Sequence, residues 1–325
     1  MNEEKICYLI LAYNDPENLY RLINRLNDRA DFYIHIDKKS EIKEFTTLFE
    51  DYPNVTFIKD RVKVYWGGFS IVQAELNLVE TALSKNNSYM RYVLLSGSDY
   101  PIKDTKEIHR FFEQNKDTEF IRGINLDELE NKELFGLHID LWQKHDYPWI
   151  NKANTKSFKL FRAAINRVLR KFPLPKSIRH HKFDLYHGSQ WWALTENCLR
   201  ELLDTYHSNE RDYLNFKIGF ASDEKFFHTL FFNSSYASRN QVNGPDQPIA
   251  VKDRTETSMQ TSLLANIHII DKSMTKWFSY KDFDEIIASD KLFVRKVSTE
   301  KSEKLLDAID QHILGNEVKA NEQIE

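Results

Sequence analysis

The 325-residue chain contains only two cysteines, Cys7 and Cys198, and nine glycines. Two cysteines exclude a disulfide-stapled scaffold and a cysteine-based zinc site. The sequence also lacks the phosphate-binding loops GxxxxGK[ST] and GxGxxG, the HExxH zinc motif and the GxSxG nucleophile turn. A classical dinucleotide-binding fold therefore has little support.

The chain has neither an excess of positive charge nor a long apolar run. Its 45 lysines and arginines against 49 acidic residues give a formal net charge of -4, which argues against a nucleic-acid-binding protein. The first apolar run, at 6–12, ends at Asn14 and Asp15, so it is too short for a transmembrane helix or a signal peptide. We expect a cytoplasmic protein without a transmembrane segment, with peripheral contact at the inner face of the cell membrane left open.

The first hundred residues alternate between predicted strands and predicted helices. Asp15 is expected to cap the first helix, with Pro16 at its first position, and Ser40 to cap the second. Such alternation predicts an α/β fold with a mainly parallel central sheet and helices on both of its faces. The apolar patterns predict strands at 6–12, 32–36, 55–58 and 92–95, and helices at 16–26, 40–48 and 70–84.

Polar residues follow three of these strands, at Tyr13–Asp15, Asp37–Lys39 and Ser96–Asp99. In parallel α/β sheets, ligands bind outside the carboxyl ends of the strands. We therefore predict that the N-terminal part binds a nucleotide, with Tyr13 and Asn14 among the contacting residues.

We expect one catalytic domain over residues 1–300, made of a nucleotide-binding half at 1–123, a helical insertion at 124–185 and a catalytic and acceptor half at 186–300. Residues 301–325 should form a C-terminal helix that frays into a tail at 311–325. The basic segment 152–179 of the insertion is interpreted either as a solvated helical face or as a contact for the acceptor or an anionic surface.

Arg295 and Lys296 are candidates for binding a diphosphate, because an arginine fork and a lysine charge together can neutralise it without a metal. The fourth strand ends with a single carboxylate, Asp99, and the Asp-x-Asp at Asp282–Asp284 has the pattern of a helix start. We therefore expect no metal. Taken alone, an Arg-Lys pair is also typical of a protein surface.

Two further segments carry residue types suited to sugar chemistry. Asp223 and Glu224 precede an apolar helical run, where Asp223 can cap the helix and the helix dipole favours the ionised Glu224 that a general base requires. Simple capping is the alternative. Gly188–Trp192 combines amides with two indoles, which suits a sugar ring, whereas two buried core tryptophans are the alternative.

Six segments, in order, resemble motifs of glycosyltransferase family 14. That family includes the core-2/I-branching β-1,6-N-acetylglucosaminyltransferases and the peptide O-xylosyltransferases. The matches extend over roughly residues 5–298. The segments are YIHIDKKS at 33–40, WGGFS at 66–70, LSGSDYP at 95–101, GSQWWALT at 188–195, SDEKFFHTL at 222–230 and LFVRK at 292–296.

The resemblance implies a GT-A-type, Rossmann-like fold and an inverting, metal-independent transfer from a UDP-sugar to a glycan or glycolipid acceptor, with no cofactor. N-acetylglucosamine is the sugar we expect. The residue roles that the resemblance implies are a catalytic base at Glu224, uridine contacts at Asp37, Trp66 and Gly67, diphosphate contacts at Arg295 and Lys296, donor-sugar contacts at Gln190 and Trp191, and an acceptor contact at Asp99.

The chain departs from the family pattern at two positions. His268 stands where the family often has an arginine, so one cationic contact is either lost or supplied elsewhere, with Lys272 and Lys252 as the candidates. Gln190 stands where xylosyltransferases tend to have aspartate, which argues against a xylose donor. The sequence shows neither the membrane anchor nor the many cysteines of the Golgi relatives, so we expect a bacterial-type cytoplasmic member that builds a surface or secreted glycan. The alternatives are a metal-dependent transferase that uses Asp99 with another carboxylate, and a glycan- or nucleotide-binding module without turnover.

Overall fold

The computed structural model describes residues 4–322 except 86, 131, 136–159, 161–163, 165–181 and 218. Most of the expected insertion at 124–185, with its basic segment, lies outside the described residues. No helix among the described residues combines the length and the apolar character needed to cross a membrane.

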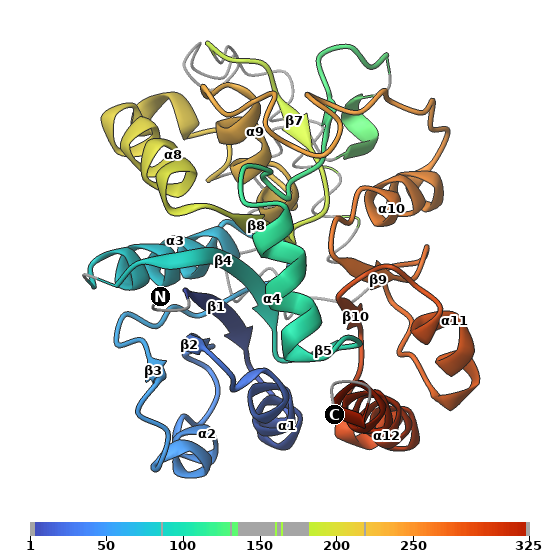
Figure 1. Ribbon diagram of the computed structural model, residues 1–325. Helices are drawn as coiled ribbons and strands as arrows, with labels where there is room; N and C mark the ends of the chain where they lie inside the picture. Colours follow the sequence, from blue (N-terminus) through green and yellow to red (C-terminus); the bar gives the residue numbers. More distant parts are fainter. Residues whose placement is uncertain are drawn as a thin grey trace.

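A five-stranded sheet forms the centre of the molecule (Figure 1). Its strand order is β3-β2-β1-β4-β8, in which the first four strands run parallel and β8 is antiparallel to β4. This confirms the mainly parallel sheet. The strands are β1 (Lys5–Ala12), β2 (Ala30–Ile36), β3 (Val55–Phe57), β4 (Tyr89–Ser96) and β8 (Ala193–Leu194).

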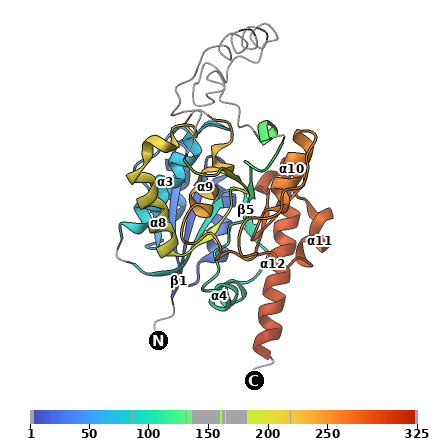
Figure 2. The ribbon, with the colours of Figure 1, turned by 90° about the horizontal axis from the view of Figure 1, so that it is seen from above.

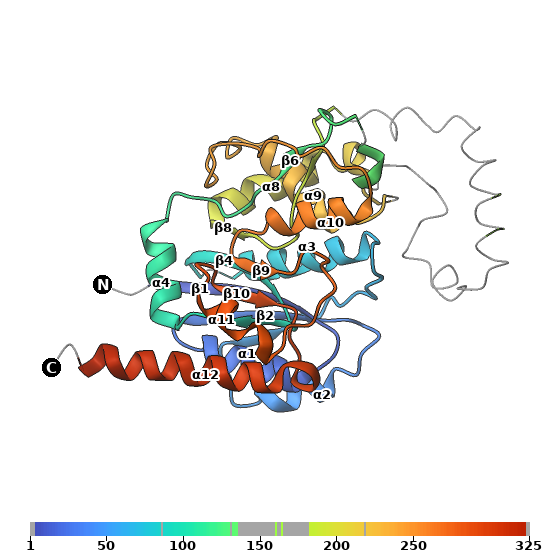
Figure 3. The ribbon, with the colours of Figure 1, turned by 90° about the vertical axis from the view of Figure 1, so that its right-hand side faces the viewer.

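Helices cover both faces of this sheet, as predicted (Figure 3). Successive side chains of a strand point to opposite faces, so Cys7 and Leu9 join one apolar core while Ile6, Tyr8 and Ile10 join another. Helices on the first side are α3 (Ser70–Leu83), α8 (Glu196–Ser208) and α9 (Phe226–Phe232). On the second side lie α1 (Pro16–Leu26), α2 (Lys43–Thr46), α4 (Thr105–Gln114) and α12 (Thr299–Glu322).

A three-stranded sheet brings the C-terminal part of the chain back to the end of β4. Its order is β5-β10-β9, and the antiparallel pairing of β10 with β5 places Arg295 opposite Asp99. The remaining described elements are β5 (Asp99–Pro101), β6 (Ile124–Asn125), β7 (Tyr186–His187), β9 (His268–Ile270), β10 (Phe293–Arg295), α10 (Arg254–Leu263), α11 (Phe283–Ile287) and short 3₁₀ helices at η1 (Thr47–Phe49), η2 (Lys132–Phe135), η4 (Glu210–Tyr213), η5 (Ser222–Glu224) and η6 (Tyr280–Asp282).

The local predictions had mixed outcomes. Asp15 caps α1 by accepting a hydrogen bond from the Asn18 amide at 3.1 Å, and Asp282 stands at the start of α11, as predicted. The predicted Ser40 cap is wrong, because α2 begins only at Lys43 and the Ser40 hydroxyl donates to the Tyr13 carbonyl at 2.5 Å.

The expected frayed tail at 311–325 is also wrong for most of its length. Helix α12 continues to Glu322 and extends past the body of the molecule (Figure 2). Its Leu305, Leu306, Ile309 and Ile313 are buried in the core on the α1 side. The sequence contains no proline after these residues, and the helix continues through Gly315 and Asn316 although both residues are typical of helix ends.

Candidate active site

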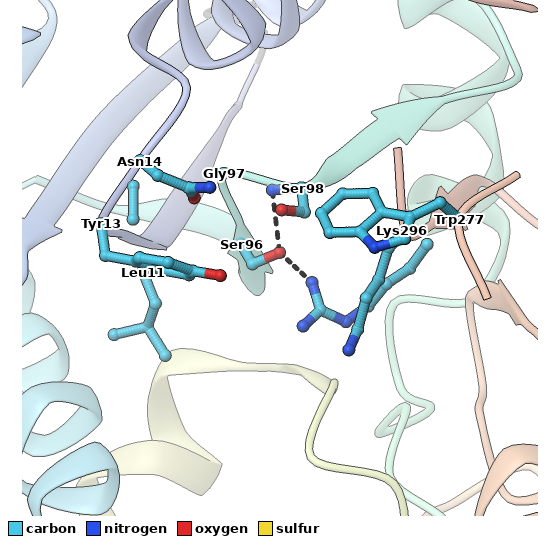
Figure 4. A pocket seen from close by; sticks show the side chains of 10 residues that line it. Leu11, Tyr13, Asn14, Ser96, Gly97, Ser98, Trp277 and Lys296 are labelled. Atoms are coloured by element: carbon cyan, nitrogen blue, oxygen red, sulfur yellow. Dashed lines mark hydrogen bonds between the residues drawn. The ribbon is translucent and has the colours of Figure 1, made fainter. Parts of the chain in front are cut away.

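A pocket lies at the carboxyl ends of β1 and β4 (Figure 4). Tyr13 and Asn14 follow β1 on one side of it, and Lys296 and Trp277 stand on the other (Figure 4). The structure thus brings together four residues that the sequence predicted as nucleotide contacts, Tyr13, Asn14, Arg295 and Lys296. Trp277 was not predicted, because it lies in a loop without any periodic pattern.

Arg295 is fixed at the edge of this pocket by three contacts. Its Nη1 donates to Asp99 Oδ1 at 2.8 Å and to the Ser96 hydroxyl, and its guanidinium carbon lies 4.2 Å from the centre of the Trp191 ring. The positive guanidinium is attracted to the negative face of the indole. The pocket therefore borders on a cation whose position is set before a ligand arrives.

Asp99 lies behind Arg295 and is fully buried. It accepts hydrogen bonds from the Ser96 amide at 2.7 Å, the Ser96 hydroxyl at 2.9 Å and His268 Nε2 at 3.2 Å. Burial by itself would raise the pKa of this carboxyl, but Arg295 and His268 hold the pKa at about 2. Asp99 is therefore ionised at neutral pH and presents no surface to an acceptor, contrary to the expectation from the sequence.

His268 likewise has no exposed side-chain surface, so it does not replace a phosphate-binding arginine by direct contact. Its contact with Asp99 instead connects it to Arg295 through the shared carboxylate. Lys252 and Lys272, the other candidates for that charge, are exposed and are not among the residues lining the pocket.

Glu224 belongs to η5, where three segments distant in sequence meet. The Ala221 amide donates to the Gly67 carbonyl at 2.9 Å, and the Gly188 amide donates to the Glu224 carbonyl at 2.8 Å. The expectation that Asp223 caps a helix is wrong, because α9 begins at Phe226 and no side chain caps η5 or α9. The WGG, GSQWW and SDE motifs are thus held together by backbone hydrogen bonds.

The Glu224 side chain is 23% exposed. Burial and the neighbouring Asp223 raise its pKa to about 8, while Lys225 opposes this shift. The expected stabilisation of the ionised form by a helix dipole is therefore overridden by desolvation and like charge. A carboxyl with such a pKa can exchange protons near neutral pH, as general-base catalysis requires.

Gln190 and Trp191 follow Gly188, whose amide is hydrogen-bonded to the Glu224 carbonyl, and Trp191 contacts Arg295 at the pocket. Gln190 Nε2 donates to Glu75 Oε1 at 2.6 Å, and Trp191 lies beneath the Arg295 guanidinium. Glu75 is fully buried on α3, and burial raises its pKa well above the ordinary value. Glu75 was not predicted as a site residue, although it is a carboxylate within the apolar stripe of the helix predicted at 70–84.

Asp37 follows β2 and lies beside the carboxyl end of β1. Its amide donates to the Ala12 carbonyl at 2.9 Å, and its Oδ1 accepts from the Lys39 amide at 2.9 Å. Trp66 is 78% exposed and forms a T-shaped contact with Phe220, with ring centres 5.2 Å apart. The exposed indole thus stands beside the segment that carries Glu224, and its donor-binding role stays a prediction.

Gly67 is required by both its backbone conformation and its surroundings. Its φ is +73°, and a Cβ there would lie 2.5 Å from the Phe220 ring. We expect Gly67→Ala to lower the free energy of unfolding by about 1–3 kcal/mol in urea titrations. Gly244→Ala is the control, because Gly244 also has a positive φ but nothing within 4 Å of the added Cβ. Equal losses in the two variants would show that crowding against Phe220 contributes nothing.

A family profile described as "Branch: Core-2/I-Branching enzyme" matches residues 6–278. The chain belongs to the Core-2/I-branching enzyme family. The resemblance to glycosyltransferase family 14 and the expected α/β fold are thereby confirmed. The family match includes Asp37, Gln190 and Glu224, whereas Arg295 and Lys296 lie beyond it and reach the pocket through β10.

Several curated relatives of this Core-2/I-branching family member are xylosyltransferases. Xylosyltransferase 2 of Homo sapiens is 22% identical over 324 residues, which cover 96% of this chain and 34% of the relative. Xylosyltransferase oxt of Drosophila melanogaster is 28% identical over 117 residues, covering 35% and 12%, and a xylosyltransferase of Ciona intestinalis is 27% identical over 123 residues, covering 37% and 14%. The chain spans about a third or less of the length of these relatives.

Proposed function

We propose that this chain is a glycosyltransferase that transfers a sugar from a UDP-sugar to a hydroxyl of a glycan or glycolipid acceptor, with inversion at the anomeric carbon. The observation that carries the proposal is the connection between Glu224 and Arg295. Gly188 is hydrogen-bonded to the backbone of Glu224, and Trp191, three residues later, supports Arg295 at the pocket. A base and a diphosphate-binding cation are thus positioned by the same short segment.

In this reaction Glu224 takes the proton of the acceptor hydroxyl while the oxygen attacks the anomeric carbon. The bond from that carbon to the diphosphate oxygen breaks, and its electron pair leaves with UDP. One displacement converts an α-linked donor into a β-glycoside. Arg295 and Lys296 stabilise the charge that grows on the diphosphate, and a prepositioned cation does this without reorganising during the reaction.

We further propose that the transfer needs no metal. The hydrogen bonds of Asp99 to Ser96, His268 and Arg295 support this, because a cation bound by Asp99 would have to displace them. Among the described residues, no group of three or more His, Cys, Asp or Glu side chains is arranged to hold a metal ion. The metal-dependent alternative makes the opposite prediction for activity in EDTA.

N-acetylglucosamine is the donor sugar that we propose. Gln190, at the position where xylosyltransferases tend to carry aspartate, supports a donor other than xylose. Its amide donates to Glu75, which fixes the orientation of this polar side chain two residues after Gly188, the residue hydrogen-bonded to the Glu224 carbonyl.

Calorimetric titration tests the donor site. We expect UDP to bind in EDTA with an affinity that Mn²⁺ does not increase, and UDP-N-acetylglucosamine to bind more tightly than UDP-xylose. Lys296→Met should weaken UDP binding by about tenfold or more, because a charge-assisted hydrogen bond contributes roughly 1.5–3 kcal/mol. The exposed lysine variant Lys272→Met, outside the pocket, should bind as the wild type does.

Each other outcome contradicts one part of the proposal. Binding that requires Mn²⁺ would favour the metal-dependent transferase. UDP binding without sugar transfer to any of a panel of glycan acceptors would favour the binding module. An absence of UDP binding in both conditions would contradict the nucleotide-sugar donor altogether.

A further inference from the structure

His187 is a buried histidine next to the proposed base. It ends the short strand β7, and its side chain is 2% exposed. Its Nδ1 lies 3.9 Å from Glu224 Oε2, and its Nε2 lies 2.7 Å from the Thr261 hydroxyl on α10. Within the described part of the chain, Nδ1 has no hydrogen-bond partner. A buried acceptor or donor without a partner is costly, so this nitrogen calls for an explanation.

The hydrogen bonds of Thr261 determine which nitrogen of His187 carries the proton. A threonine hydroxyl has one hydrogen, and Thr261 donates it to the Thr257 carbonyl at 2.9 Å. The Thr261 oxygen must therefore accept from His187, which places the ring proton on Nε2. In the neutral ring, Nδ1 then carries a lone pair that faces the Glu224 carboxyl.

The charges around this pair keep the ring neutral. Burial, together with Lys225 and His228, lowers the pKa of His187 well below its ordinary value. Glu224 is faced by Asp223 and Lys225 from its own segment and by His187 from β7. Lys225 is itself held by the Phe220 and Ala221 carbonyls at 2.9 Å, so its ammonium stays on the backbone rather than on the carboxyl.

We propose that His187 is a positioning residue for Glu224, whose Nδ1 accepts a hydrogen bond from the carboxyl once that group has taken the acceptor's proton. This inference rests on the proposed role of Glu224 as the base. The two atoms are 3.9 Å apart, so the Glu224 carboxyl must approach the ring by less than about 1 Å to reach hydrogen-bond length. Because the bond exists only with the protonated carboxyl, it raises the proton affinity of the base and favours removal of the acceptor's proton.

Two isosteric variants separate the two ring nitrogens. In His187→Asn the side-chain carbonyl can take the place of Nδ1 and still accept from Glu224. His187→Gln instead extends its amide to the place of Nε2, keeps a donor for Thr261 and leaves no acceptor beside Glu224. The readout is the pH dependence of kcat/KM, with UDP affinity measured in parallel to show that each variant is folded.

We expect the acid limb of the profile to move to lower pH by about half to one unit in His187→Gln, and its plateau to fall about three- to tenfold. In His187→Asn the acid limb should stay where it is in the wild type. Thr261→Val removes the acceptor of the Nε2 proton and lets the ring place that proton on Nδ1, facing the carboxylate. Its acid limb should therefore also move to lower pH, which gives a test outside His187 itself.

An acid limb that stays at the wild-type pH in both His187→Gln and Thr261→Val would overturn the inference, even if turnover falls, because a purely structural role lowers the plateau alone. If His187→Gln does not fold, Thr261→Val decides. Failure of the underlying proposal looks different, since a Glu224→Gln variant would then retain wild-type turnover.

Discussion

Replacing Glu224 with glutamine is expected to lower kcat by about 10²–10⁴-fold while leaving the affinity for UDP unchanged. Glutamine preserves the size of the side chain and its hydrogen-bonding ability but cannot accept a proton from the acceptor hydroxyl. The backbone hydrogen bond from Gly188 to residue 224 remains in the variant, so the neighbouring Gln190 and Trp191 keep their positions. Initial rates at saturating donor and acceptor measure the effect.

The raised pKa of Glu224 supplies a stability control for the same variant. The carboxyl has a pKa of about 8 in the folded protein against an ordinary value of 4.5, so the folded state favours the protonated form. Its contribution to stability is complete below about pH 4.5 and is lost as the pH rises through 8. At pH 9, Glu224→Gln should therefore unfold at a higher temperature than the wild type, and near pH 4 at a similar one.

The matched control for turnover is Glu80→Gln, because Glu80 is an exposed carboxylate whose partner is His207 at 2.9 Å. We expect this variant to retain wild-type turnover. A Glu224→Gln enzyme that works within a few-fold of the wild-type rate would remove Glu224 from the role of base. Lost turnover together with lost thermal stability at pH 9 would instead indicate a structural defect.

Local sequence patterns predicted much of the N-terminal half of the fold. The apolar runs of β1, β2 and β4 and the Asp15-Pro16 helix start are short-range signals, and the structure contains all of them. Pairings between distant segments were not predictable in this way. The three-residue strands β5 and β10 are too short to carry a period, and only their pairing with each other brings Arg295 opposite Asp99.

The same distinction applies to the candidate site. Tyr13, Asn14, Arg295 and Lys296 were predicted because strand ends and a cationic pair can be recognised in sequence, and they line one pocket. Asp99 was predicted as an acceptor contact, but it is buried and, together with His268, supports Arg295. Burial depends on the packing of elements far apart in the chain, so a polar residue's type alone does not reveal it.

Removal of the Asp99 carboxylate is expected to be the most destabilising of the substitutions considered for this site. Asp99→Ala should lower the free energy of unfolding at pH 7 by about 3–5 kcal/mol, as removal of one partner of a buried ion pair typically does. The guanidinium of Arg295, whose side chain is 16% exposed, and the buried His268 would lose their shared acceptor. Urea titration measures the loss, and UDP binding should weaken with it because Arg295 is no longer fixed.

The surface variant Asp307→Ala is the control. Asp307 pairs with Arg21 at 2.7 Å but is half-exposed, so its removal should cost at most about 1 kcal/mol. A loss in Asp99→Ala no larger than in this control would contradict the idea that a buried ion pair holds Arg295 at the pocket.

The pH dependence distinguishes the charge of Asp99 from its packing. The pKa of Asp99 is about 2 in the folded protein against an ordinary value of 3.8, so its charge contributes stability above about pH 4 that is lost as the pH falls toward 2. The difference between wild type and Asp99→Ala should therefore shrink by about 1–2 kcal/mol between pH 7 and pH 2.5, since one pKa unit corresponds to about 1.4 kcal/mol. A difference that stays constant over this range would mean that Asp99 stabilises the fold through the packing of its side chain and not through its charge. Trp191 and Ser96, rather than a buried anion, would then hold Arg295 at the pocket.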